Sequence, residues 1–511
     1  MSGDTWRTHF LRNTITNYLC VLTRIGSGLV LFRMLFEHLS HEQFGYYSLL
    51  WSLFGYAILL DFGLGVAVQK NVARAAATGE TQMLNRLVAT VVWSFAGIAL
   101  LLLAVFAVGN HWFLAAIQVR PADRAEFARA YFVFFSMLAL NFPMGLFPEI
   151  LRGLQRLDVA NWTTIAGNVV NVVAMALALH ARASFPTIVF ISTATTLLPK
   201  VLAAPCAYRH MPHLSLHPRN FCLGEVKGVL SFSLVAYLIT FTTLIMQRTD
   251  LGVISVTIGV TWVALYQVGF KAAEMFGLFT KQLQEALSPA AAHLGAKNDH
   301  AGLRQLLFGS WRLTLLVATP LYVLCAAYLG SVIKILSGMH SVSPATFWVG
   351  QTLLLSTYSS MAVDSCSRRV LVMCGWEKPL LRLSLVEAGI NLVLSFALVR
   401  PMGLLGVAVG TLVPTVLIGW LGVIPLTTRF FGMGLRELIR QVVQPVLAPV
   451  AASVGALAAL MLLVPLPADA RFLECSWRGA VVCLVTLIFA APYLRNLMRK
   501  APLARAAQPA L

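Results

Sequence analysis

The sequence has few charged residues and no pattern of paired cysteines. Asp, Glu, Lys and Arg together make up 11% of the chain, whereas hydrophobic residues make up 58%. A soluble domain typically carries about 25% charged residues, so the composition excludes an ordinary soluble protein. The 8 cysteines are scattered without the spacings of a zinc site, so we expect neither disulfides nor a structural metal. His210, His213 and His217 match no metal-binding spacing either, and no cofactor is expected.

The positive charge is distributed in a way that argues against a nucleic-acid partner. Lys and Arg number 38 against 20 Asp and Glu, which gives a net charge of +18. In a soluble chain this excess would suggest DNA or RNA binding. Here the charges lie in short breaks between apolar runs, and no basic domain remains to hold a duplex. Membrane topology explains the excess better.

The apolar runs are long enough to cross a bilayer. A helix needs about 20 apolar residues to span the hydrocarbon core. By this measure the chain is predicted to be an all-α polytopic membrane protein of about fourteen transmembrane helices. The predicted spans lie near residues 14–36, 45–68, 87–109, 127–150, 162–180, 185–206, 229–247, 256–280, 309–333, 347–367, 383–400, 403–426, 443–465 and 477–495.

The loops between these spans alternate in their content of Lys and Arg. If the N-terminus is cytoplasmic, most basic residues fall on the cytoplasmic side, as the positive-inside rule requires. The predicted even number of spans then places both termini in the cytoplasm. Arg7 and Arg12 precede a first apolar run that is too long for a signal peptide, so this segment is predicted to be a retained helix.

A weak internal repeat divides the predicted helices into two lobes. Asn171 in the fifth span corresponds to Asn391 in the eleventh. The segments Phe44–Tyr47 and Gly153–Arg156 recur at Val263–Tyr266 and Gly375–Lys378, at nearly the same separation. Transporters are commonly built from such repeats, with a substrate site at their interface. We therefore expect an N-terminal six-helix lobe at 1–206, a cytoplasmic linker at 207–228, a C-terminal six-helix lobe at 229–426, and two additional helices with a cytoplasmic tail at 427–511.

Two basic residues lie near the middle of predicted spans. Arg24 belongs to a polar stripe on one face of the first span, which consists of Asn13, Asn17, Cys20, Arg24 and Ser27. A charged side chain at the bilayer centre costs about 2.5–3.5 kcal/mol, so such residues face a bundle interior or a wet cavity. We expect Arg24 and Lys271 to line a cationic cavity for an anionic substrate. A structural ion pair with Glu274 is the alternative for Lys271.

Other charged residues lie near the ends of the spans. Arg33 and Arg248, at the outer ends of spans one and seven, would assist in binding the substrate; snorkelling to the interface is the alternative. Asp364 lies four residues before Arg368, a spacing that favours a pinned helix end over a substrate contact.

Three carboxylates are candidates for coupling-ion or gating residues. Asp61, Glu274 and Asp250 lie within or at the ends of predicted spans, where a carboxylate can carry a proton or a cation. Pairing of Asp61 with Lys70 or Arg74 would explain its presence equally well.

The loops on the predicted outer side are all short. A membrane glycosyltransferase or polysaccharide polymerase usually needs a sizeable outer loop that carries catalytic carboxylates and holds the sugar acceptor. The sequence offers no such loop, so this alternative is disfavoured and we expect a protein without enzymatic activity.

The second span carries the most recognisable segments. It opens with Glu42-Gln43-Phe44-Gly45-Tyr46 and closes with Asp61-Phe62-Gly63-Leu64-Gly65. This pattern resembles the start of bacterial polysaccharide flippases, the Wzx-type branch of the multidrug/oligosaccharidyl-lipid/polysaccharide exporter superfamily. The resemblance covers about residues 10–426, and Arg248-Thr249-Asp250 is similar to the end of span seven in that family. Ala264 departs from the family, which usually has a glycine there.

The resemblance implies a flippase that moves undecaprenyl-diphosphate-linked oligosaccharide across the bacterial inner membrane by alternating access. The pathway would make a polysaccharide or a lipopolysaccharide O-antigen. Membrane lipids, H⁺ or Na⁺, and polysaccharide polymerase and chain-length proteins are the implied partners. The same fold also serves cation-coupled exporters of drugs or small lipophiles, which is the alternative function.

Reporter fusions test the predicted topology. Fusions after Lys70, Arg156, Arg219 and Arg436 should be active only as cytoplasmic reporters, because loops rich in Lys and Arg are retained on that side. Fusions after Arg182 and Arg400, in predicted outer loops, serve as controls and should give the opposite signal. A periplasmic signal from any of the first four positions would overturn the topology.

Overall fold

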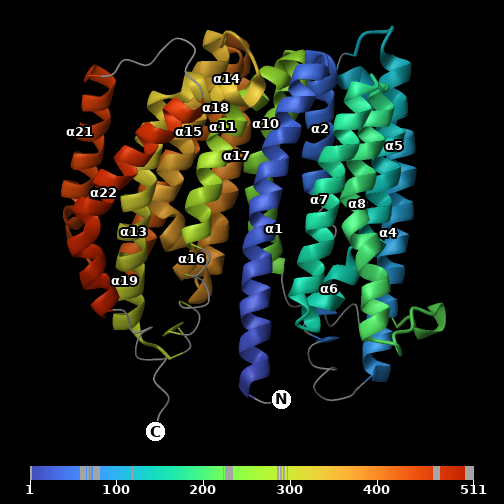
Figure 1. Cartoon of the computed structure of the whole chain (residues 1–511), viewed down its shortest axis with the longest axis horizontal. Coiled ribbons are helices and arrows are strands. Elements are labelled where there is room, and N and C mark those ends of the chain that lie inside the picture. The colour runs from blue at the N-terminus through green and yellow to red at the C-terminus, as the bar shows by residue number, and fades with distance from the viewer. Residues whose placement is uncertain are drawn as a thin grey trace. The chain divides into compact units, whose positions relative to one another are not determined.

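The computed structural model is helical throughout the part of the chain that it describes. It describes residues 3–57, 65, 68–69, 71–72, 81–117, 119–222, 224, 234–284, 287, 291, 294–295, 297–463 and 472–500. The regular elements in these ranges are all helices, which confirms the all-α prediction (Figure 1). Helices suit so apolar a chain because a segment in lipid must satisfy its own backbone hydrogen bonds.

Among the described residues, 9 helical segments are long and apolar enough to cross a membrane. Each of them overlaps one predicted span. The other predicted spans fall on shorter, interrupted or more polar helices, or partly outside the described residues. The count of fourteen therefore stays a prediction.

The chain divides into two compact units, Met1–Ala264 and Leu265–Leu511, with the boundary inside α11 (Val260–Gln284). The helices of the first unit are α1 (Gly3–His38), α2 (His41–Ala57), α4 (Thr81–Ala116), α5 (Arg124–Met144), α6 (Leu146–Gly153), α7 (Leu157–His180), α8 (Phe185–His210), the 3₁₀ turn η2 (Pro218–Asn220) and α10 (Leu234–Thr257). The helices of the second are α13 (His300–Ala327), α14 (Leu329–Ser337), α15 (Pro344–Ser359), η3 (Ser360–Asp364), α16 (Ser365–Met373), α17 (Glu377–Met402), α18 (Leu404–Ile418), η4 (Gly419–Val423), α19 (Ile424–Phe431), α20 (Leu435–Val442), η5 (Gln444–Val446), α21 (Leu447–Leu463) and α22 (Phe472–Lys500). The predicted lobe boundaries at 206 and 229 stay a prediction.

Several helix ends follow from local chemistry. Ser343 caps α15 by accepting a hydrogen bond from the N–H of Thr346 at 3.1 Å, and Pro344 occupies the first turn, where its missing N–H is no loss. α14 and α19 end at Gly338 and Gly432, whose φ angles of 71° and 60° favour glycine. These boundaries are thus set by residues at the helix ends.

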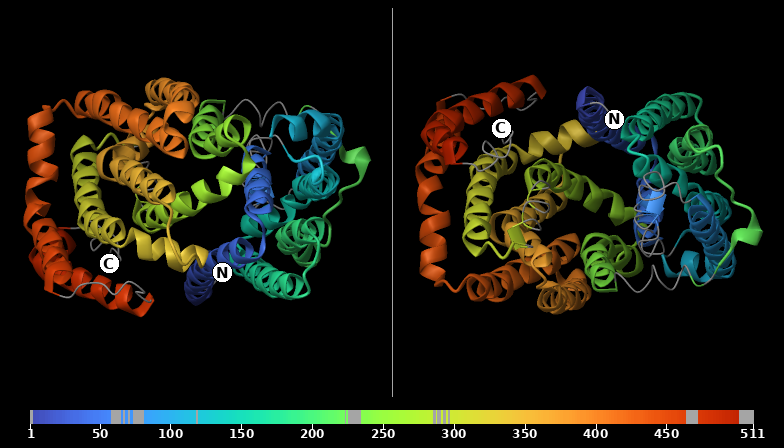
Figure 2. Two further views of the ribbon diagram at one scale, coloured as in Figure 1. Left: turned by 90° about the horizontal axis from the view of Figure 1, so that it is seen from above. Right: turned by 90° about the horizontal axis from the view of Figure 1, so that it is seen from below.

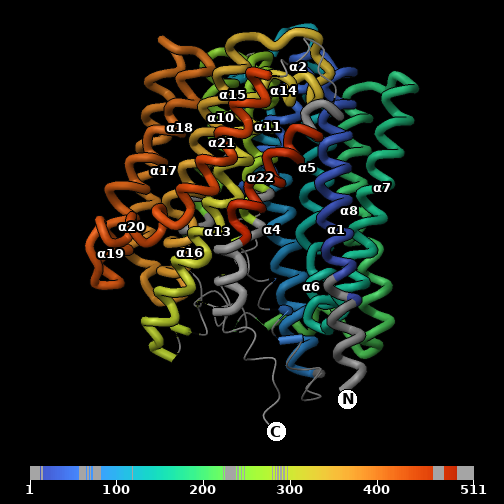
Figure 3. The backbone as a smooth tube through the Cα atoms, turned by 60° about the vertical axis from the view of Figure 1, so that its left-hand side comes forward, coloured from blue at the N-terminus to red at the C-terminus, as the bar shows by residue number. Residues whose placement is uncertain are grey.

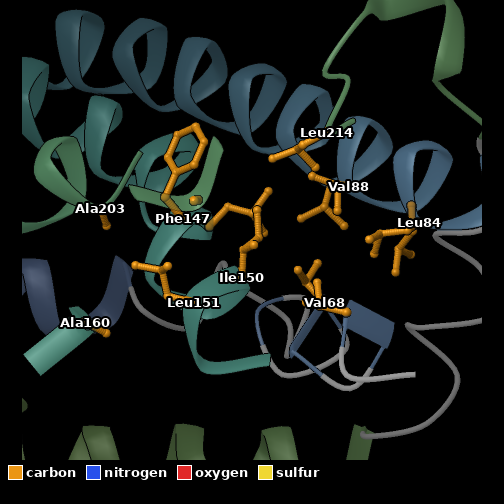
Figure 4. Close-up of a cluster of buried hydrophobic side chains, with 14 of the residues drawn as sticks. Val68, Leu84, Val88, Phe147, Ile150, Leu151, Ala160, Ala203 and Leu214 are labelled. Carbon is orange, nitrogen blue, oxygen red and sulfur yellow. The ribbon is translucent and has the colours of Figure 1, made fainter. Parts of the chain in front are cut away.

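In the first unit, α8 packs against α5 and α7, α4 packs against α5, and α1 lies along α7 (Figure 1). A buried apolar cluster joins α6 to α4, and Ile150 of α6 points toward Val88 of α4 (Figure 4). α5 ends and α6 begins at Gly145, two residues after Pro143. Proline has no backbone N–H, so the helical hydrogen bond that it would donate is lost here.

Part of the predicted linker is anchored on α4. Leu214 is buried in the same apolar cluster (Figure 4). The Asn85 side chain donates to the carbonyl of His213 at 2.9 Å and accepts from the N–H of Ser215 at 3.0 Å. The indole of Trp93 donates a further hydrogen bond to the following turn of this segment. Packing and hydrogen bonds from side chains of α4 to the linker backbone therefore hold the linker to the first unit at this point.

In the second unit, α18 packs closely against α17 and α15. Gly406 permits this approach, because a Cβ atom there would lie 2.1 Å from the carbonyl oxygen of Leu398. Asn391 is fully buried in the same contact and donates to the carbonyl of Gly410 at 3.2 Å and to the hydroxyl of Thr411 at 3.0 Å. α18 packs between α17 and α15 in the second unit as α8 packs between α7 and α5 in the first.

The two C-terminal helices pack on each other and on α13. The hydroxyls of Ser453 and Thr486 lie 2.7 Å apart and join α21 to α22. Arg478 of α22 is 2% exposed, and its guanidinium lies 5.9 Å from the centre of the Tyr328 ring at the end of α13. This buried contact thus joins α22 to the end of α13 within the second unit.

Substitution of Gly406 tests the α17–α18 contact. Gly406→Ala forces the backbones apart and should lower the unfolding midpoint of the purified protein in detergent by several degrees, since overpacking costs about 1–3 kcal/mol. Gly389→Ala in α17 is the matched control, because a Cβ atom there meets nothing within 4 Å. Equal midpoints for the two variants would contradict this packing.

Candidate functional site

Arg24 lies in an exposed position on α1. Its guanidinium makes neither a hydrogen bond nor an ion pair with any residue that the structure describes. α1 meets α7 on another face, where Asn161 donates to the hydroxyl of Thr16 at 3.4 Å. Among the four predicted binding cations, Lys271 and Arg33 are ion-paired, whereas Arg24 and Arg248 form no ion pair with a described residue.

The polar stripe around Arg24 leaves room beside the guanidinium. The hydroxyls of Thr23 and Ser27 donate to carbonyls of α1, at 2.9 Å and 3.2 Å. Their protons are therefore already used within the helix, and the guanidinium of Arg24 remains the donor for an anion. Gly28 lies one turn beyond Arg24 on the same helical face, and a Cβ atom added there would meet nothing within 4 Å. The side chain of Asn13 lies outside the described residues. The helix thus presents a charged group next to open space.

Two other predicted cations are paired within their own helices. Lys271 and Glu274 of α11 form an ion pair at 2.7 Å, which is the structural pairing that the sequence allowed. Arg33 and Glu37 of α1 form an ion pair at 2.9 Å with both side chains exposed. Any role of these cations in binding an anion requires the pairs to open. Asp61 lies outside the described residues.

Arg248 and Asp250 lie on α10, which packs against α2. The carbonyl of Arg248 accepts a hydrogen bond from the hydroxyl of Ser52 at 2.9 Å. The side chain crosses Gly55, where a Cβ atom would lie 3.0 Å from Nε. This nitrogen is buried without a hydrogen-bond partner among the described residues, and Asp250 is 4% exposed. Arg248 thus keeps one unused donor in a confined position.

The structure contains a buried ionic cluster that the sequence analysis recognised only in part. Arg368 of α16 donates from Nε to Asp364 at 2.5 Å and from Nη2 to Glu387 of α17 at 2.8 Å. Its third nitrogen donates to the hydroxyl of Ser384 at 3.2 Å. Asp364 and Glu387 are 1% and 8% exposed. The predicted pair of Asp364 and Arg368 is present at the start of α16, and Arg368 also joins α16 to α17 through Glu387.

The missing partner in that prediction was Glu387. Its position inside an apolar run was visible, because a carboxylate within a predicted span needs a partner. The backbone around Asp364 was not predictable from periodicity: η3 and η4 are π-helical segments that pack against each other, and Asp364 lies at the end of η3. Such segments interrupt α-helices and are found frequently at functional sites.

A second polar contact was also missed. Lys200 lies within α8 and donates to the side-chain oxygen of Asn141 at 2.7 Å. Asn141 belongs to α5, one turn before the break at Gly145. The signal was the pairing of a lone lysine with a lone amide in two predicted neighbouring helices.

The fold is shared with several solved transporters. The structure of the lipid II flippase MurJ in an inward closed conformation is 15% identical, covers 94% of this chain and 100% of its own, and has a TM-score of 0.70. An inward-facing multidrug resistance MATE family transporter of the MOP superfamily is 13% identical over 83% of this chain and 98% of its own, with a TM-score of 0.66. A MOP superfamily transporter from Pyrococcus furiosus is 13% identical over 85% and 96%, with a TM-score of 0.55.

These similarities establish the class: the chain is a multi-pass membrane protein with the fold of MOP superfamily transporters. The family follows from the sequence. A family described as polysaccharide biosynthesis protein matches residues 10–293, which is more than half of the chain. The chain belongs to this family, which confirms the membership expected from the second span. A search of curated proteins finds no match.

Removal of Arg368 tests the ionic cluster. Arg368→Met leaves two buried carboxylates without a counter-charge and should destabilise the protein by roughly 3–5 kcal/mol, seen as a lower unfolding midpoint and a smaller yield of monodisperse protein. The triple variant Asp364→Asn/Arg368→Met/Glu387→Gln should recover most of that loss. Arg400→Met, at an exposed arginine of α17, is the control. If Arg368→Met unfolds at the wild-type temperature, the cluster does not contribute to the stability of the protein.

Proposed function

We propose that this protein is a flippase for undecaprenyl-diphosphate-linked oligosaccharide in the bacterial inner membrane, with alternating access as its mechanism. The observation that carries the proposal is membership of the polysaccharide biosynthesis family over residues 10–293. The similarity of the fold to that of a lipid II flippase supports a lipid-linked substrate. The product pathway would be that of a polysaccharide or a lipopolysaccharide O-antigen.

Arg24 is the residue proposed to bind the substrate's anionic part. Placing an unneutralised charge within a spanning helix costs about 2.5–3.5 kcal/mol. Charged residues that are kept at such positions commonly mark the path of a substrate or an ion. A guanidinium presents a planar fork of donors that matches phosphate oxygens. The open space at Gly28, one turn from Arg24 on the same face, would admit a diphosphate beside the helix.

The remaining predicted residues take secondary roles in this proposal. Arg248 would offer its unpartnered Nε to the substrate, and Lys271 and Arg33 would contribute when their ion pairs open. Asp61, Glu274 and Asp250 remain candidates for binding the coupling H⁺ or Na⁺. Opening of the Lys271–Glu274 pair would free a cation and a carboxylate together, so substrate binding and ion binding could be linked at this pair.

The cellular setting follows from the same proposal. A flippase of this kind hands its substrate to a polysaccharide polymerase and chain-length proteins on the outer side. Both termini would lie in the cytoplasm, as the distribution of Lys and Arg predicts.

A cation-coupled exporter of drugs or small lipophiles is the second candidate. It is favoured by the similarity of the fold to that of multidrug resistance MATE transporters. Cationic drugs would be repelled by an unpaired arginine, whereas an anionic lipid-linked sugar would be attracted. Drug susceptibility of a deletion strain separates the two: unchanged drug susceptibility with loss of surface polysaccharide supports the flippase.

The decisive variant series is at Arg24. In a deletion strain complemented with plasmid-borne protein, Arg24→Ala should abolish surface polysaccharide. Arg24→Lys should leave roughly a tenth of it, because an ammonium keeps the charge without the planar fork. Polysaccharide is measured by gel and blot, in parallel with the amount of membrane-inserted protein.

Arg182→Ala is the matched control, since Arg182 is exposed at the turn between α7 and α8, and it should leave polysaccharide unchanged. Normal polysaccharide with Ala at position 24 would remove Arg24 from the mechanism. A fall in protein amount that matches the fall in polysaccharide would instead assign Arg24 a structural role.

A further inference from the structure

The short helix α20 (Leu435–Val442) has an orientation unlike that of its long neighbours. It links α19 to α21 and contacts α13, α19 and the turn η5 (Figure 3). In Figure 2, which looks along the direction that α17 and α18 follow in Figure 1, the orange segment that contains α20 is seen lengthwise. The helix therefore crosses the direction of the spanning helices.

α20 is fixed to α13 by apolar and polar contacts. Leu438 and Val442 are buried in a cluster with Trp311 of α13. Glu437 is ion-paired with Arg304, and the carbonyl of Gln441 accepts from Arg312 Nε at 2.7 Å.

These contacts also define the depth of α20. The arginines that hold it, Arg304 and Arg312, bracket residue 309, where the predicted span of α13 begins on the cytoplasmic side. This predicted boundary would place α20 at the level where the hydrocarbon of the membrane gives way to headgroups.

The remaining surface of α20 divides into an apolar strip and a basic strip. At about 3.6 residues per turn, the strip formed by Leu435 and Ile439 adjoins the buried face of Leu438 and Val442. The strip formed by Arg436 and Arg440 follows next around the helix, on the side away from α13. Leu435 and Ile439 are 49% and 41% exposed. Arg436 and Arg440 are exposed, and neither has an ion-pair partner among the described residues. Glu437, the acid of the helix, is already engaged by Arg304.

We propose that α20 is an interfacial helix that binds the headgroup of an anionic phospholipid of the surrounding bilayer. Arg436 and Arg440, one turn apart, form a bidentate basic site for a phosphodiester. Leu435 and Ile439 enter the acyl region just below that headgroup, as the apolar face of an interfacial helix does. Because α20 is attached to α13, bound lipid would set the depth of α13 in the membrane. This site concerns the bilayer and does not depend on the transported substrate.

Photolabelling of the full-length protein in nanodiscs tests this proposal. The probe is phosphatidylglycerol with a photoreactive group on its headgroup, and labelled peptides are mapped by mass spectrometry. Wild-type protein should be labelled within residues 433–443, and unlabelled phosphatidylglycerol should compete far better than phosphatidylcholine. Arg436→Gln/Arg440→Gln should weaken competition at this peptide roughly 25-fold, at about fivefold for each basic residue.

Controls are available within the same chain. Arg182→Gln/Arg400→Gln removes the same charge from exposed positions elsewhere and should leave labelling of the α20 peptide unchanged. The Arg436→Gln/Arg440→Gln variant should unfold at the wild-type temperature, because both side chains are exposed. Leu435→Ser/Ile439→Ser should reduce labelling by a probe whose reactive group is in the acyl chain.

Three outcomes would overturn the proposal. Equal labelling of α20 by phosphatidylcholine and phosphatidylglycerol would show that the basic pair selects no headgroup. Unchanged labelling in Arg436→Gln/Arg440→Gln would place the lipid elsewhere. Competition by undecaprenyl phosphate but not by phosphatidylglycerol would make α20 a binding site for the carrier lipid instead of the bilayer. None of these results bears on the Arg24 experiment, so the two proposals fail separately.

Discussion

The high cost of an unpaired charge in an apolar environment organises much of this structure. A chain with 11% charged residues must give each charge inside a spanning helix a partner, water or a ligand. Arg368 has two carboxylates, Lys200 has an amide oxygen, and Arg478 has an aromatic ring and hydroxyl. These satisfied charges join helices to one another. Arg24 stands apart from them because its guanidinium has no such partner in the described chain.

This contrast separates charges that hold the fold from a charge that remains available. The cluster at Arg368 joins α16 to α17, and the contact of Arg478 with Tyr328 joins α22 to the end of α13. Both guanidinium groups are engaged by other side chains of the protein. Arg24 and the Nε of Arg248 have unused donors, which an anion could accept. The difference gives a physical basis for choosing binding candidates that the presence of charge alone does not provide.

The sequence predicted the helices well because their signal is local. Apolar length sets a spanning helix, and local residues such as Gly338 and Pro344 set helix ends. The partners of the charges were harder to predict, since Glu387 reaches Arg368 from another helix. A spacing of three residues did reveal the pair of Lys271 and Glu274, because both lie on one helical face. The sequence could not show that Arg24 would be left without a partner, since this depends on every neighbouring side chain.

The facing π-helical segments η3 and η4 have a consequence for how this family can change in length. A π turn closes its hydrogen bond over one residue more than an α turn. Loss of one residue from η4 would therefore convert it to α-helix, while α18 and α19 could keep the faces that they now present. An equal loss in the middle of α18 would rotate everything beyond it by about 100° and misplace Gly406 or Gly410 against α17. Single-residue deletions in related chains should accordingly collect at the π turns and be rare in the glycine-lined contact.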